Sequence, residues 1–82
     1  MSHWNYRVVK EHEQYGSGCY IFEVHYDENG SPESWLEYCA PYGNSLNEIA
    51  SDIEMMKEAL SKPCLVLVKD ETTGRETLVE EQ

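Results

Sequence analysis

The sequence predicts an α+β fold in which one helix packs across one face of an antiparallel sheet of three to five strands. Three observations predict this fold. Apolar and polar side chains alternate in strand fashion along much of residues 4–39, whereas residues 45–60 repeat apolar side chains every three or four positions, as an amphipathic helix does. A short apolar run at 64–68 follows the helix. The resulting order, β-β-β-α-β with a fifth strand as an option, packs most simply in two layers.

The first two strands are expected at 4–13 and 19–27, on either side of a glycine-containing turn at 14–18. Side chains of the second strand divide between two faces. One face carries Tyr20, Phe22, Val24 and Tyr26, and the other carries Cys19, Ile21, Glu23 and His25. The helix needs an apolar face, so we expect it on the first of these, together with Trp35 of the third strand. Glu37 on the same face counts against this choice.

A hairpin at Asn29-Gly30 is the strongest local signal in the chain. Both residues tolerate the positive φ angles that a two-residue type I′ turn requires. This turn places Val24 opposite Trp35. The third strand then covers 33–39, with Pro32 at its start, where a missing N–H is tolerated.

The helix is expected to begin at Ser45, whose hydroxyl accepts from the backbone N–H of Glu48 in a capping box. It should end at Lys62-Pro63, because proline disfavours helical geometry at the residue before it. The apolar stripe consists of Leu46, Ile49, Ile53, Met56 and Leu60. Two heptads are too few for a coiled coil, so we assign the stripe to covering the sheet.

After the helix, residues 64–68 are expected to form a central strand and residues 75–79 an edge strand. The whole chain, residues 1–82, is expected to be a single domain with its core in Trp4–Val68 and a frayed acidic tail at Glu80–Gln82. The amino terminus lacks the apolar segment of a signal peptide, and no apolar run reaches the ~18 residues of a membrane span. We therefore expect a cytoplasmic protein, which the odd number of cysteines also favours.

Acidic residues dominate the charge. Sixteen Asp and Glu against six Lys and Arg give a net charge of -10 and a pI of about 4.5. Such a field repels phosphate backbones and anionic membranes, so we expect no direct binding to nucleic acid or membrane. The favoured partner is a protein with a basic surface. The plainer alternative is that the acids only aid solubility.

The sequence offers little support for catalysis, metal binding or a cofactor. His25 and Asp27 lie two residues apart on one strand face, but the spacing around them matches neither a zinc site nor a calcium loop. Cys19, Cys39 and Cys64 all lie in expected strands, where a small buried side chain is the usual role. We therefore expect a protein that is not an enzyme and needs no metal or cofactor.

Several segments along residues 4–65 occur together in a recognisable combination. They are Trp4-Asn5-Tyr6-Arg7-Val8-Val9, the stretch Glu23 to Pro32, Trp35, Ser45-Leu46, Asp52-Ile53-Glu54-Met55-Met56 and Lys62-Pro63. This combination resembles a family of small proteins of bacteria and of phage or mobile elements, for which no activity is assigned. The resemblance therefore implies no functional residues. The chain differs from that family in continuing beyond Lys62-Pro63 to Gln82.

Size, charge and the absence of a catalytic motif favour a small, acidic, non-catalytic protein-interaction module. Its expected surface combines the sheet face that the helix leaves uncovered with exposed acids: Ile21, Glu23, His25, Leu36, Tyr38, Glu28, Glu33, Glu37, Glu54 and Glu58. A sharper version is a phage or mobile-element inhibitor of a host defence or nucleic-acid-handling complex, whose acids would have to lie on one continuous face. The alternative is a small-ligand-binding or regulatory domain that uses an aromatic surface around Trp35. Pairing through an edge strand or the uncovered sheet face would give a homodimer.

Overall fold

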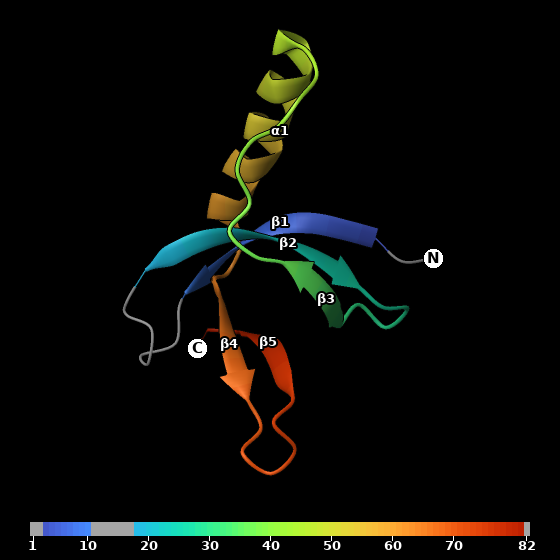
Figure 1. Ribbon diagram of the computed structural model, residues 1–82, viewed down its shortest axis with the longest axis vertical. Helices are drawn as coiled ribbons and strands as arrows, with labels where there is room; N and C mark the ends of the chain where they lie inside the picture. The colour runs from blue at the N-terminus through green and yellow to red at the C-terminus, as the bar shows by residue number, and fades with distance from the viewer. Residues whose placement is uncertain (1–2, 11–17, 82) are drawn as a thin grey trace.

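A computed structural model describes residues 3–10 and 18–81, and within these ranges the chain forms five strands and one α-helix (Figure 1). The strands are β1 (His3–Lys10), β2 (Cys19–Tyr26), β3 (Pro32–Leu36), β4 (Leu65–Lys69) and β5 (Glu76–Glu80). Helix α1 (Leu46–Glu58) continues into a 3-10 turn, η2 (Ala59–Ser61), between β3 and β4. The α+β class is confirmed. The expected continuation of the first strand over 11–13 and the turn at 14–17 lie outside the described residues.

The sheet is mixed, so the expectation of an antiparallel sheet is wrong. Its order is β3-β2-β1-β4-β5. Adjacent strands are antiparallel except β1 and β4, which pair in parallel with Val9 beside Leu65. The reason lies in the connection: β3 runs in the direction of β1, and α1 returns the chain so that β4 runs that way too. The predicted register, with Val24 opposite Trp35, holds over Glu23–His25 but shifts by one residue at Tyr26, which lies opposite Pro32.

The sheet curls into a half-barrel, and this curvature brings its two edge strands, β3 and β5, into contact. The concave inner face holds one core cluster. Its buried members are Val9, Phe22, Val24, Tyr26, Leu65 and Leu78, with Trp35 and Leu67 packed against them. Curling therefore lets the strands cover this face themselves.

Helix α1 lies on the convex outer face of the sheet, opposite to the face expected from the sequence. Met56 of α1 and Ala59 of η2 pack against Tyr6 and Val8 of β1. Figure 1 shows the helix rising away from the sheet, with only its carboxyl end close to the strands. The assignment of the helix to the Tyr20, Phe22, Val24 and Trp35 face is wrong because the curled sheet already buries that face.

The turn between β2 and β3 is not the type I′ turn expected. Gly30 has a φ of 82°, whereas Asn29 is not among the residues with positive φ. The N–H of Asp27 donates to the carbonyl of Ser31 (2.9 Å), which closes a three-residue loop with a left-handed glycine. Asp27 favours this loop, because its carboxylate accepts from the N–H groups of Asn29 (2.9 Å) and Ser31 (3.0 Å).

Strand β3 is shorter than the expected range of 33–39. It ends at Leu36, and Tyr38 then adopts a φ of 54°. The Tyr38 ring meets the rings of Tyr20 and Phe22 edge-on, with centroid distances of 4.8 and 5.6 Å. The expectation that Tyr38 shares the face opposite Phe22 is therefore wrong, because the left-handed residue reverses the alternation of the strand.

The ends of α1 agree with the sequence. The hydroxyl of Ser45 accepts from the N–H of Glu48 (3.1 Å). Lys62 is extended (φ -102°, ψ 157°), as expected for the residue before Pro63.

The carboxyl-terminal segment is ordered further than expected. Strand β5 confirms the expected edge strand and includes Glu80. The N–H of Glu81 donates to the carbonyl of Cys64 (2.8 Å), and its carboxylate lies 2.7 Å from the Nζ of Lys10. The expected frayed tail is therefore held in place at Glu80 and Glu81. Gln82 lies outside the described residues.

Candidate interaction groove

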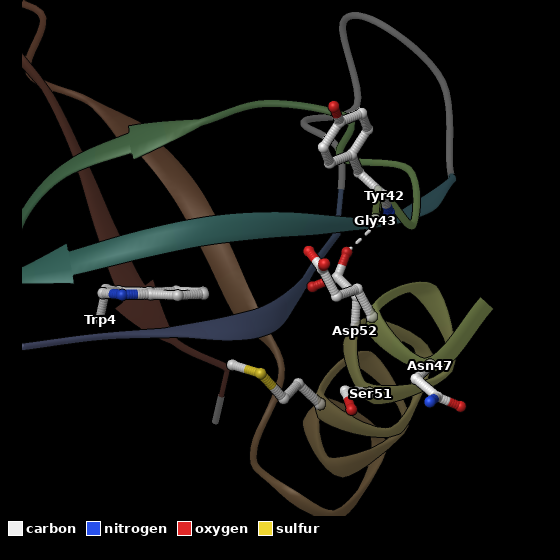
Figure 2. A pocket seen from close by; sticks show the side chains of 8 residues that line it. Trp4, Tyr42, Gly43, Asn47, Ser51 and Asp52 are labelled. Carbon is white, nitrogen blue, oxygen red and sulfur yellow. Dashed lines mark hydrogen bonds between the residues drawn. The ribbon is translucent and has the colours of Figure 1, made fainter. Parts of the chain in front are cut away.

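An open groove of about 390 Å³ runs between one flank of α1, the start of β1 and the loop before the helix. Its lining is mainly apolar, with two carboxylates. The residues are Trp4, Tyr42, Gly43, Asn47, Glu48, Ser51, Asp52 and Met55. Figure 2 shows the Trp4 ring on one side of the opening and Asn47, Ser51 and Asp52 of the helix on the other.

Asp52 connects the three elements that border the groove through two hydrogen bonds. One carboxylate oxygen accepts from the hydroxyl of Tyr6 on β1 (2.6 Å), and the other accepts from the N–H of Tyr42 in the loop (2.8 Å, dashed in Figure 2). Asp52 therefore fixes the helix to both neighbours. Burial, and then the hydrogen bond to the Asp52 carboxylate, raise the pKa of Tyr6 far above its ordinary range, so the phenol remains a donor.

Trp4 forms the aromatic wall of the groove and is 41% exposed. Its ring packs edge-on against Tyr6 (centroids 5.3 Å apart) and stacks beside His25 (6.1 Å). His25 is in turn fixed by Glu23, whose carboxylate lies 2.7 Å from the His25 Nε2. The indole therefore packs against two rings while part of its surface stays exposed.

Gly43 allows the loop to lie directly against the helix. A Cβ atom at this position would collide with the backbone of Ile49 and Glu48. The neighbouring Tyr42 ring is 70% exposed, and its hydroxyl donates to the Oδ1 of Asn44 (2.9 Å). The close approach of the loop to the helix therefore requires a glycine at this position.

The groove combines an indole, a thioether and two carboxylates. An indole face attracts a cation through its quadrupole, and a nearby carboxylate can accept hydrogen bonds from the same group. This set of side chains suits the binding of a basic, partly apolar chain such as Lys or Arg. Within residues 3–10 and 18–81, no three His, Cys, Asp or Glu side chains gather as a metal site would require.

The residues expected to form one interaction surface are spread over the molecule. Ile21 packs against the cluster beneath the helix. Glu23 and His25 contact each other, and Leu36 is 59% exposed at the end of β3. The remaining acids are distributed as follows: Glu28 and Glu33 belong to the β2–β3 hairpin, Glu37 follows β3, and Glu54 and Glu58 lie on α1.

Sequence reasoning missed Trp4 and Met55 as parts of a site. By sequence, Trp4 belongs to the first expected strand and Met55 lies outside the apolar stripe of the helix, so neither residue is distinguished as part of a site. Both become part of the groove because α1 sits on the Tyr6 face of β1. Placing the helix on that face would have put Trp4 beside it.

No known protein family, curated protein or solved structure matches this chain. Among the described residues, the structure contains no helix that is both long and apolar enough to cross a membrane.

Proposed function

We propose that the protein is a non-catalytic interaction module that binds a basic segment of a partner protein, with the groove between α1 and β1 as the anchor. The observation that carries this proposal is the partly exposed indole of Trp4 in the same groove as the carboxylates of Glu48 and Asp52. A Lys or Arg side chain can stack on the ring and reach a carboxylate. The net charge of -10 adds a long-range attraction for such a partner.

The inhibitor version of this function needs a continuous acidic face. The described acids instead lie on α1, on the β2–β3 hairpin, directly after β3 at Glu37, and on the β4–β5 hairpin. The β4–β5 hairpin projects at the opposite end of the molecule from α1 (Figure 1). This distribution favours an anchored basic segment over imitation of a phosphate backbone. The alternative of a ligand site at Trp35 has less support, because Trp35 packs against the inner core.

The test uses a fluorescent hexa-arginine peptide and its neutral hexa-citrulline counterpart, with anisotropy as the readout. We expect the first peptide to bind and the second to bind far more weakly. Trp4→Leu should weaken binding about fivefold, since a cation–π contact is worth about 0.5–2 kcal/mol. Glu48→Gln should weaken it by a similar factor while leaving the backbone cap at Ser45 intact.

Glu71→Gln is the matched control. It removes the same charge from the β4–β5 turn, which lies at the opposite end of the molecule from α1 (Figure 1). Because salt screens exposed charges that lie far apart, it should change affinity less than about twofold. An equal loss of affinity in Glu71→Gln and Glu48→Gln would show that the peptide senses only the overall charge. Equal binding of the two peptides would also overturn the proposal.

A further inference from the structure

A row of exposed apolar side chains runs along α1 and into η2, on a flank of the helix other than the one that lines the groove. Leu46, Ile53 and Leu60 are spaced by seven residues and are 88%, 46% and 70% exposed. Seven residues are close to two helical turns, so the three side chains fall in line. Of the stripe predicted from the sequence, only Met56 is buried, so most of it faces solvent.

This row, here named the Leu46 strip, is free of acids. By helical geometry, Ala50 and Lys57 lie beside it, whereas Glu54 and Glu58 point away. In a chain with 16 acidic residues, the strip is a surface along which two copies can approach without facing like charges.

The protein exposes more surface than a monomer of its mass is expected to expose. The accessible area is 6200 Å². A folded monomer of 9.5 kDa is expected to expose about 5,000 Å². The excess of about 1,200 Å² is larger than the ~800 Å² that each partner buries in a standard interface. The radius of gyration, 13.6 Å, also exceeds the roughly 12 Å of a compact chain of this length.

We propose that a second copy of this chain covers the Leu46 strip, with the two helices antiparallel about a two-fold axis near Ile53. Antiparallel pairing sets Leu46 against Leu60 of the other copy and Ile53 against itself, which makes the strip self-complementary. The groove side chains Asn47, Ser51 and Met55 lie on the other flank and remain open. The inference is therefore independent of the proposed binding of a basic partner.

The dimer has a salt dependence that distinguishes it from binding of a basic segment. Salt screens the repulsion between two chains of charge -10, so dimerisation should strengthen as salt rises. Apolar burial itself is not weakened by moderate salt. Binding of a basic peptide should weaken under the same conditions.

Sedimentation equilibrium of the full chain at 10–200 µM, in low and moderate salt, tests the proposal. We expect a monomer–dimer equilibrium for the wild type. Ile53→Glu places two like charges across the axis and should raise the dimer dissociation constant at least tenfold. Leu46→Glu should act in the same direction, and since Leu46 is 88% exposed its replacement leaves the fold undisturbed.

Met55→Glu is the matched control, because Met55 lies on the same helix, is 40% exposed and faces the groove. It should leave the dissociation constant within about twofold of wild type. A wild type that stays monomeric at 200 µM in moderate salt would overturn the proposal. So would dissociation by Val79→Glu on the exposed face of β5 without an effect of Ile53→Glu, because the dimer would then use the sheet.

Discussion

Removing the hydroxyl of Tyr6 should loosen helix α1 from the sheet. Tyr6 is 8% exposed and donates to Asp52 at 2.6 Å. Hydrogen bonds to charged groups contribute about 1.5–3 kcal/mol, so we expect Tyr6→Phe to lower the free energy of unfolding by about 1.5 kcal/mol. A domain of 82 residues has a total stability of roughly 4–12 kcal/mol. This one atom therefore carries a substantial share of it.

A double-mutant cycle with Asp52→Ala isolates the bond, because alanine leaves no acceptor for the Tyr6 hydroxyl, whereas the amide oxygen of asparagine would still accept from it. Urea unfolding followed by tryptophan fluorescence gives the free energy of unfolding for each variant. We expect a coupling energy of about 1 kcal/mol between the two positions. Tyr42→Phe is the control, because that hydroxyl is exposed and should matter by less than about 0.5 kcal/mol. A coupling below about 0.3 kcal/mol would refute the role of this bond in anchoring α1.

The same bond predicts how stability depends on pH. Burial and Asp52 raise the pKa of Tyr6 above its ordinary value of 10.0. A raised pKa in the folded state contributes stability that is fully present below pH 10 and is lost above it, where only the unfolded phenol ionises. The wild type should therefore lose about 1.4 kcal/mol more per pH unit above pH 10 than Tyr6→Phe does. Equal slopes for the two proteins would contradict this prediction.

Two further predictions concern buried groups. The Arg7 guanidinium is buried, donates to the Pro63 carbonyl (2.6 Å) and the Tyr26 hydroxyl (3.2 Å), and leaves its Nε without a partner. Arg7→Met keeps most of the volume and should change the free energy of unfolding by less than about 1.5 kcal/mol, whereas Arg7→Ala should lower it by about 3 kcal/mol in urea titrations. Similar losses in both would show that charge, not volume, matters. Burial raises the pKa of the Cys39 thiol, whereas Cys19 is exposed. We therefore expect Cys19 to react with a disulfide reagent at pH 8 about tenfold faster than Cys39, as measured by mass-resolved labelling. Equal rates for the two cysteines would contradict this prediction.

Local elements were predictable because their determinants lie within a few residues. The cap at Ser45 and the extended residue before Pro63 follow from short-range geometry. The pairing of Val24 with Trp35 is kept because a register shift between His25 and Tyr26 offsets the longer loop. The turn type was not predicted, because the Asp27 carboxylate accepts from the N–H groups of Asn29 and Ser31 and so stabilises a three-residue loop instead of the two-residue type I′ turn. These signals do not depend on how the sheet curls.

The face covered by the helix was not predictable from strand patterns. Strand β1 has apolar residues on both faces, with Val8 outside and Val9 inside. Arg7 lies on the inner face and makes that face look polar in sequence. Its guanidinium is buried because the acceptor carbonyl comes from Pro63, far along the chain. The groove depends on the same long-range packing, since Trp4 and Asp52 line one groove only when α1 lies over Tyr6.

The two proposals assign separate flanks of one helix to separate tasks. Asp52 and Met56 hold α1 to the loop and the sheet, Asn47 and Met55 line the groove, and the Leu46 strip lies clear of both. A groove this open gives one cationic side chain only a modest affinity. A dimer through the strip carries two such grooves, and simultaneous contacts can raise apparent affinity by 10²–10⁴ when a partner spans both. Dimerisation would thus turn a weak anchor into a selective one, for partners with two basic segments at the matching separation.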